Sequence, residues 1–299
     1  MIGTRHSGSS ARRAIQVGFA LTWAACVGAQ TPAPATDIYV YRLDRPQDGV
    51  VNITKRAGYD NQPAYLGARL AWTRQSEGKT DIWWLNLEAP AAFTKTPESE
   101  YSAALTADGK GVAVIRVELD STQRLWRFPI GPGAPSVVLA DIKPVGYFAY
   151  LDSTTLALFV LGSPNTLQIA DTRTGKGTVV TMNVGRSLQR VPGGRRASFA
   201  QRVSGKTMLQ TVDPTPRADG SFAIDTVATL PDSADYVVWR TPLTLITGAG
   251  SRLMQLHLPA REWTLLADLS AQGIQRISRL ALSPDGRRLA FVADEPRRP

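Results

Sequence analysis

Residues 282–292 read Leu282-Ser283-Pro284-Asp285-Gly286-Arg287-Arg288-Leu289-Ala290-Phe291-Val292. Ser, Pro, Asp and Gly together form a polar turn, and the apolar residues after it have the length and composition of a short β-strand. The same arrangement occurs earlier, as Leu105-Thr106-Ala107-Asp108-Gly109-Lys110-Gly111-Val112-Ala113-Val114-Ile115. Weaker copies lie at residues 67–72, 151–159, 192–199 and 241–246. One turn followed by one strand therefore repeats along the chain.

A second pattern follows each copy, in which aromatic or branched residues alternate before another polar turn. Its clearest copies are Asp37-Ile38-Tyr39-Val40-Tyr41 and Asp81-Ile82-Trp83-Trp84-Leu85. The six copies begin at residues 37, 81, 124, 166, 207 and 252, so successive starts differ by 41 to 45 residues. A steady period of this length, built from strands and without a comparable helical pattern, is typical of a β-propeller with four strands per blade.

The ends of the repeat region predict how the ring closes. The chain enters in the third strand of a blade (37–43) and continues into the fourth (50–55). It finishes with the first two strands of a blade (277–282 and 287–293). We therefore predict an all-β, six-bladed β-propeller of four-stranded blades, closed by pairing the N-terminal and C-terminal strands in one shared blade. Such closure removes open sheet edges, which would otherwise recruit other chains.

These repeats resemble those of a known group. Residues 283–292, together with Asp81-Ile82-Trp83 and Asp37-Ile38-Tyr39, resemble the WD-like repeats of the TolB-like propellers. The resemblance covers about residues 37–294 and is weakest from 186 to 250. Members of this group are bacterial and usually exported, and they act as periplasmic or surface interaction modules or as the propeller beside a peptidase domain. The resemblance thus implies a fold and an exported location. It implies no particular activity, because a propeller is a scaffold for unrelated functions.

The composition is that of a globular protein. Hydrophobic residues make up 43% and charged residues 20%, and 34 Lys and Arg against 25 Asp and Glu give a net charge of +9. These values exclude a disordered, collagen-like or coiled-coil chain. One Cys and two His (His6 and His257) exclude a disulfide scaffold and a His/Cys zinc site. His257 lacks the partners of a nucleophile triad, so we expect it to be structural and predict no catalytic residue.

Residues 1–29 predict a secretory signal peptide. They contain Arg5, Arg12 and Arg13 but no acidic residue, and an apolar stretch (14–27) leads to a small-residue end. That stretch is too short to span a bilayer, which takes about 20 residues. We expect cleavage after Ala29 and a periplasmic or secreted protein.

The remaining boundaries follow from this cleavage. A linker occupies residues 30–36, the TolB-like propeller residues 37–294 and a tail residues 295–299. Cys26 follows Trp23-Ala24-Ala25, which resembles a bacterial lipobox with Trp in place of Leu. Lipidation of Cys26 would instead leave the protein anchored to a membrane.

Candidate binding residues gather at one opening of the predicted channel. The connections from each fourth strand to the next first strand surround this opening, which we call the mouth. Four of the six connections carry a Tyr, and three of these pair it with a neighbouring carboxylate. Converging aromatic, basic and acidic groups suit a polar ligand, although a Tyr at a strand entry also packs against the next blade. The predicted ligand-binding residues are Tyr59, Asp60, Asn61, Glu100, Tyr101, Tyr147, Arg186, Asp235, Tyr236 and Arg276.

We expect different roles within this set. The stacking residues would be Tyr101, Tyr147 and Tyr236. The anion-pairing residues would be Arg186 and Arg276, and Glu100 and Asp235 would bind cations or hydroxyl groups. An alternative assigns Asp60, Asn61, Glu100 and Asp235 to a central Ca²⁺, as in propeller lactonases. The sequence has no metal-loop spacing here, so the main interpretation needs no cofactor.

Basic residues occupy turns on the face opposite the mouth. They are Lys110, Arg195, Arg196, Arg287 and Arg288 at hairpins between first and second strands, and Lys176, Arg217 and Arg261 near third-to-fourth connections. This basic face could make peripheral contact with anionic lipid or an envelope polymer, or could simply be solvated. Export separates the protein from nucleic acid, which we do not expect as a partner.

The favoured function is a non-enzymatic binding module of the bacterial cell envelope. It would be a monomer that binds an envelope protein, a peptide or a glycan at the mouth. The alternative is a Ca-dependent propeller hydrolase of the lactonase type. A third possibility is an assembly subunit that uses the basic face.

Overall fold

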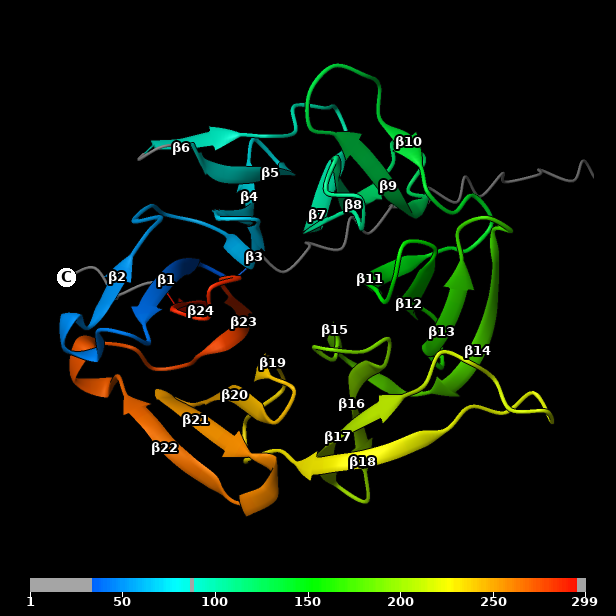
Figure 1. Ribbon diagram of the computed structural model, residues 1–299. Helices are drawn as coiled ribbons and strands as arrows, with labels where there is room; N and C mark the ends of the chain where they lie inside the picture. The colour runs from blue at the N-terminus through cyan, green and yellow to red at the C-terminus, as the bar shows by residue number, and fades with distance from the viewer. Residues whose placement is uncertain (1–33, 87–88, 295–299) are drawn as a thin grey trace, which may run out of the picture. The chain divides into compact units, whose positions relative to one another are not determined.

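The computed structural model describes residues 34–86 and 89–294. The predicted signal peptide with Cys26, most of the predicted linker and the predicted tail lie outside the described residues. The described chain folds into six four-stranded antiparallel sheets, which form the blades of a propeller (Figure 1). The predicted fold class is confirmed.

Blades 1 to 3 follow one another along the chain. Blade 1 contains β3 (Asp60–Leu66), β4 (Arg69–Ser76), β5 (Lys79–Asn86) and β6 (Ala89–Ala92). Blade 2 contains β7 (Ser99–Leu105), β8 (Gly111–Val117), β9 (Gln123–Pro129) and β10 (Ser136–Val137). Blade 3 contains β11 (Val145–Tyr150), β12 (Thr155–Val160), β13 (Thr166–Asp171) and β14 (Lys176–Met182).

Blades 4 to 6 complete the ring. Blade 4 contains β15 (Val184–Arg190), β16 (Ala197–Val203), β17 (Lys206–Val212) and β18 (Ile224–Thr229). Blade 5 contains β19 (Val237–Thr241), β20 (Thr244–Ala249), β21 (Arg252–His257) and β22 (Trp263–Asp268). Blade 6 contains β23 (Ser278–Leu282), β24 (Arg288–Asp294), β1 (Thr36–Arg42) and β2 (Val50–Asn52).

Blade 6 is the shared blade that closes the ring. Its strand order is β2-β1-β24-β23, so strands from both ends of the repeat region lie in one sheet. β1 pairs with β24 from Thr36–Asp294 through Arg42–Arg288. Every blade starts its third strand within two residues of the predicted position, which confirms the period read from the sequence.

The repeated Asp-Gly turn is held by side-chain hydrogen bonds. In blade 6 the Ser283 hydroxyl donates to Asp285 at 2.5 Å, and the same carboxylate oxygen accepts the Arg287 N–H at 3.1 Å. In blade 2 Thr106 and Asp108 make the same pair at 2.5 Å. A short polar side chain that bonds its own backbone fixes the turn and lets the next strand start at a defined residue.

A second contact ties third strands to fourth strands. The Thr54 hydroxyl donates to the Asp37 carboxylate at 2.6 Å and accepts the Ile38 N–H at 3.1 Å. Thr94 makes the equivalent bonds to Asp81 and Ile82 in blade 1. β2 ends at Asn52, three residues before the predicted end, because the Asn52 side chain accepts the N–H groups that follow and turns the chain.

The core lies between the blades. Three of the second strands, β8, β12 and β24, are buried along nearly their whole length. A strand covered on both faces reads as a continuous apolar run, and Leu156-Ala157-Leu158-Phe159-Val160 is an example. Figure 1 shows the first strands, β3, β7, β11, β15, β19 and β23, innermost around the axis.

Helical structure is confined to three single turns within the described residues. They are the 3₁₀ helices η1 (Pro46–Asp48), η2 (Leu258–Ala260) and η3 (Ser270–Gln272). Across residues 34–86 and 89–294 we find no helix with the length and apolarity needed to cross a bilayer.

Candidate functional site

A central channel runs between the first strands. A cavity of about 150 Å³ occupies it, and all six first strands contribute to its lining. The polar residues around it are Gln62, Ser102, Tyr147, Arg186, Ser187, Gln189, Tyr236 and Arg279. The whole ring therefore builds the site in the channel, where these polar side chains lie among apolar ones such as Phe148 and Leu280.

Each first strand carries an irregularity in its pairing with the second strand. Within these irregularities Gln62, Ser102 and Arg279 have φ values of 53°, 54° and 31°. Non-glycine residues rarely adopt this left-handed conformation, and when they do it often occurs at functional sites. A bulge also redirects the side chain of the extra residue. All three residues line the channel.

Arg279 lies among tyrosines in this channel. Its Nη2 donates a 2.8 Å hydrogen bond to the Tyr147 hydroxyl, and its Cζ lies 5.3 Å from the Tyr147 ring centroid. The same guanidinium lies 4.9 Å from the Tyr236 ring centroid. Burial lowers the pKa of Arg279, but Tyr236 and Tyr147 outweigh this, so that its pKa lies above its ordinary value.

The structure brings together the four tyrosines predicted at the mouth. Tyr59 interacts electrostatically with Arg279, Tyr147, Tyr101 and Tyr236. Burial raises the pKa of Tyr59 to about 12, and burial also raises the pKa of Tyr236. The hydroxyl groups of Tyr59 and Tyr236 therefore stay protonated at neutral pH and can act as donors. Their use in ligand binding stays a prediction.

The sequence interpretation missed Arg279 and named Arg276 instead. Arg276 is exposed and forms an ion pair of 2.7 Å with Asp294. Arg279 lies inside β23, where strand alternation alone does not reveal that a bulge redirects its side chain. A usable signal was its position, since Gln62 and Ser102 stand at the matching place in β3 and β7.

Asp60 is committed to an internal network. Its side chain is fully buried and forms ion pairs with Arg56 at 2.9 Å and Arg74 at 3.2 Å. It also accepts the Trp72 indole N–H at 2.9 Å. Burial raises the pKa of Asp60, against the lowering effect of Arg56. The carboxylate therefore has its partners within blade 1 and the connection that leads into it, and is not exposed to solvent.

Glu100 occupies the matching position in blade 2. It pairs with Arg116 at 3.0 Å and accepts the Thr96 hydroxyl at 2.5 Å. Burial raises the pKa of Glu100. In both blades the arginine covers an indole ring, at 4.3 Å for Arg74 over Trp83 and 4.4 Å for Arg116 over Trp126. The repeat thus contains an acid–arginine–tryptophan unit.

The four residues of the metal alternative are not gathered. The Asn61 amide bonds Thr36, and its carbonyl oxygen accepts the Gln62 N–H. Asp235 is exposed, whereas the carboxylates of Asp60 and Glu100 are buried beside arginines. Within the described residues no three His, Cys, Asp or Glu side chains lie close enough together to hold a metal ion.

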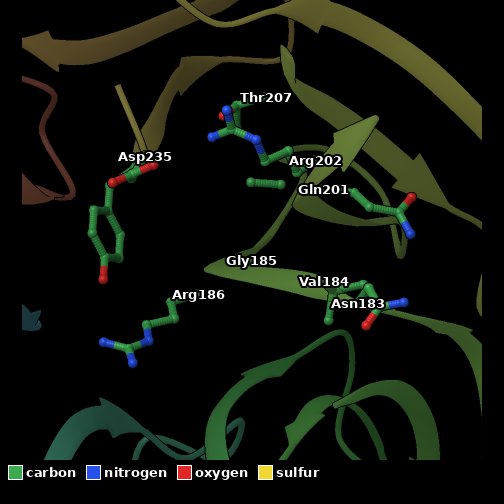
Figure 2. Close-up of a pocket in the computed structure, with 10 residues that line it drawn as sticks. Asn183, Val184, Gly185, Arg186, Gln201, Arg202, Thr207 and Asp235 are labelled. Carbon is green, nitrogen blue, oxygen red and sulfur yellow. The ribbon is translucent and has the colours of Figure 1, made fainter. Parts of the chain in front are cut away.

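A cleft lies beside the channel, between blade 4 and the connection into blade 5. Its cavity measures about 330 Å³ and shares Arg186 and Tyr236 with the channel. Figure 2 shows the side chains of Arg186, Gln201, Arg202 and Asp235 around it. Beyond it lies a third cavity of about 690 Å³, which shares Arg202 and Asp235 with the cleft. Channel, cleft and outer cavity therefore adjoin one another at the mouth through these shared lining residues.

Several residues of the basic face have acidic neighbours. Arg195 pairs with Asp152 at 2.6 Å, and Arg196 pairs with Asp225. Arg288 lies over the Tyr65 ring at 5.6 Å. Part of the positive charge on this face is therefore already neutralised. His257 is exposed, and its Nδ1 lies 3.4 Å from the Thr244 hydroxyl.

Comparisons with known proteins support the fold. No protein-family model matches the chain, and no curated protein matches its sequence. A structure assigned to TolB from Agrobacterium tumefaciens is 15% identical with a TM-score of 0.64, and the match covers 88% of this chain and 99% of that one. A gluconolactonase from Xanthomonas campestris is 10% identical with a TM-score of 0.61, covering 89% and 98%.

TolB from Acinetobacter baumannii is also similar. It is 19% identical with a TM-score of 0.51, and the match covers 64% of this chain and 48% of that one, so the matched region spans about half of that protein. The chain therefore has the fold of the TolB-like six-bladed propellers, as the sequence resemblance implied.

Proposed function

We propose that the protein is an exported, non-enzymatic binding module that takes a segment of an envelope protein, a peptide or a glycan at the mouth. The observation that carries this proposal is the group of adjoining cavities at the mouth, in which the channel lined by Tyr147 and Arg279 shares Arg186 and Tyr236 with the cleft. Concave sites with a few convergent polar groups are the usual places for ligand binding.

The side chains at the mouth would have different roles in binding. Tyrosine rings supply contact area at a low entropic cost and keep a hydroxyl available for hydrogen bonds. Arg186 and Arg202 are exposed and would pair with anionic groups of the ligand. Asp235 would accept hydrogen bonds from hydroxyl or amino groups.

The envelope location rests on the first 29 residues and on the TolB-like fold. A positively charged start, an apolar stretch and a small-residue end are the parts of an export signal. The presence of the fold in TolB proteins supports an exported module, and a mouth that binds other envelope components suits that location.

A binding comparison tests the proposal. The processed protein, an Arg186→Ala variant and an Arg261→Ala control are immobilised and exposed to solubilised envelope proteins and to a glycan array. We expect a specific protein or glycan to bind wild type and the control, and to be lost with Arg186→Ala. Equal binding to all three proteins would contradict a site at the mouth.

A second candidate is a metal-dependent hydrolase of the lactonase type. The observation in its favour is the structural similarity to the Xanthomonas campestris gluconolactonase. A thermal-shift series with Ca²⁺, Mg²⁺, Zn²⁺ and EDTA tests it. A metal at a hundred times its Kd should stabilise the folded state by about 2.7 kcal/mol. A rise with one metal that EDTA reverses would favour the hydrolase, and no shift would count against it.

A further inference from the structure

We infer that Arg279 is a receptor for a carboxylate, and that the ligand of the mouth is an acidic peptide that places an Asp or Glu side chain in the channel. This inference rests on the proposed function, since it requires that the mouth binds a ligand. It adds the chemical class of that ligand and the residue that recognises it.

The first argument is a charge comparison within the ring. Arg74 and Arg116 are largely buried, and each forms an ion pair with a buried carboxylate. Arg279 is half-buried, yet its interacting groups among the described residues are tyrosines, and no described carboxylate forms an ion pair with it. A guanidinium does not lose its proton in proteins. The channel therefore contains a positive charge that the described protein does not neutralise.

The second argument concerns hydrogen bonds. A guanidinium has five N–H donors in a planar fork that matches a carboxylate in a bidentate arrangement. The described residues supply one hydrogen bond to Arg279, from Nη2 to the Tyr147 hydroxyl. Tyr236 and Tyr147 cover the guanidinium through their rings, which attract the cation without accepting its remaining protons. An incoming carboxylate would satisfy these donors and pair the charge.

The backbone of Arg279 gives independent support. Its φ of 31° is a left-handed conformation that is unfavourable for a residue with a side chain. The bulge that imposes it places the side chain against the channel cavity. Strain of this kind is retained where the position of a side chain matters for function.

The size of the channel selects a side chain rather than a larger group. Its cavity of about 150 Å³ is comparable to one that holds a molecule the size of benzene. An Asp or Glu side chain fits such a space, whereas a substituted sugar ring with its neighbours does not. The wider cleft beside it, about 330 Å³, has room for the rest of a peptide along Arg186 and Arg202.

Peptide selection tests the inference. A phage-displayed library of random dodecapeptides is selected on the processed wild-type protein, and the best peptide is synthesised. We expect an Asp or Glu at one fixed position, and replacement by Asn or Gln should weaken binding at least tenfold. This measurement uses wild-type protein, so it does not depend on whether a variant folds.

Protein variants then separate the two proposals. The Arg279→Gln variant should bind the acidic peptide at least tenfold more weakly than wild type does. It should bind the amide peptide about as well as wild type does. The Arg186→Ala variant should bind both peptides more weakly. If Arg186→Ala weakens binding but Arg279→Gln does not, the mouth binds ligand and the inference about Arg279 is wrong. If neither variant matters, the site at the mouth is wrong as well. Selection of no peptide, or of peptides without an acid, would overturn the acidic-peptide assignment.

Discussion

The Arg279 guanidinium donates a 2.8 Å hydrogen bond to the hydroxyl of Tyr147, a residue 132 positions earlier in the chain. Arg279 belongs to the first strand of blade 6 and Tyr147 to the first strand of blade 3. In a ring of six blades these two are opposite each other, so the bond crosses the channel. A charged side chain thus reaches across the channel at the centre of the ring.

If Arg279 serves a ligand, it should not stabilise the free protein. Arg279→Met removes a charge that no described carboxylate pairs, together with its hydrogen bond to Tyr147, so we expect these effects to offset and the free energy of unfolding to change by less than about 1 kcal/mol. Urea unfolding of the free protein measures this. A loss of more than about 2 kcal/mol would show that Arg279 holds the ring together.

Asp60 should behave in the opposite way. Asp60→Ala leaves Arg74 and the Trp72 indole without their buried acceptor, and breaking a buried pair from one side costs about 3–5 kcal/mol. The matched control is Asp294→Ala, which breaks an exposed pair with Arg276 and should cost less than about 1 kcal/mol. Equal losses in the two variants, measured by urea unfolding, would refute the structural role of Asp60.

Gly248 marks a close approach between β20 and the connection into blade 6. A Cβ built at Gly248 would lie 2.4 Å from Ile277 Cγ2 and 3.0 Å from the Ile277 carbonyl oxygen. We expect Gly248→Ala to lower the free energy of unfolding by about 1–3 kcal/mol, since overpacking forces a backbone shift. At Gly194 a Cβ would meet only the Arg196 nitrogen, at 4.0 Å. Gly194→Ala should therefore unfold like wild type, and equal effects of the two changes would count against the packing argument.

Three half-buried tyrosines predict a loss of stability at alkaline pH. Burial raises the pKa of Tyr59, Tyr65 and Tyr150 to about 12. Below pH 10 these groups are protonated in both states and contribute no pH dependence. Between pH 10 and about 12 the unfolded chain releases protons that the folded chain keeps, so stability falls with rising pH, by about 2–3 kcal/mol per tyrosine at the upper end.

Urea unfolding at a series of pH values, with tyrosinate absorbance of the folded protein, checks this prediction. Tyr59→Phe provides the comparison, because it should remove the contribution of one tyrosine to the fall in the free energy of unfolding. Ionisation of Tyr59, Tyr65 and Tyr150 near pH 10 in the folded protein would contradict the prediction.

Much of the fold could be predicted from the sequence because its signals are local. In the turn at residues 283–287 the Asp285 side chain accepts hydrogen bonds from Ser283 and from the Arg287 N–H. The Asp37–Thr54 contact recurs as Asp81–Thr94, so the contacts that define a repeat are local and recur along the chain. The shared blade followed from the strand count at the two ends. The end of β2 could not be predicted in this way, because the Asn52 side chain ends the strand within a sequence that otherwise resembles a strand.

The site was predicted only where position in the ring sufficed. Tyr59, Tyr101, Tyr147 and Tyr236 converge because strand entries converge in any closed propeller. The roles suggested for Asp60 and Glu100 depended on which residues face them. Their arginine partners stand on the neighbouring strand at the paired positions 74 and 116, and register is not apparent from spacing alone. Arg279 was missed because a bulge reorients it.

The central claim is that the mouth binds a ligand, and site-specific photo-cross-linking in living cells tests it most directly. A photoreactive amino acid replaces Tyr236 at the mouth or, as the matched control, exposed Arg261 on the opposite face. The account predicts a discrete adduct from position 236 that Arg186→Ala abolishes, and none from position 261. An adduct from position 261 together with none from position 236 would contradict it.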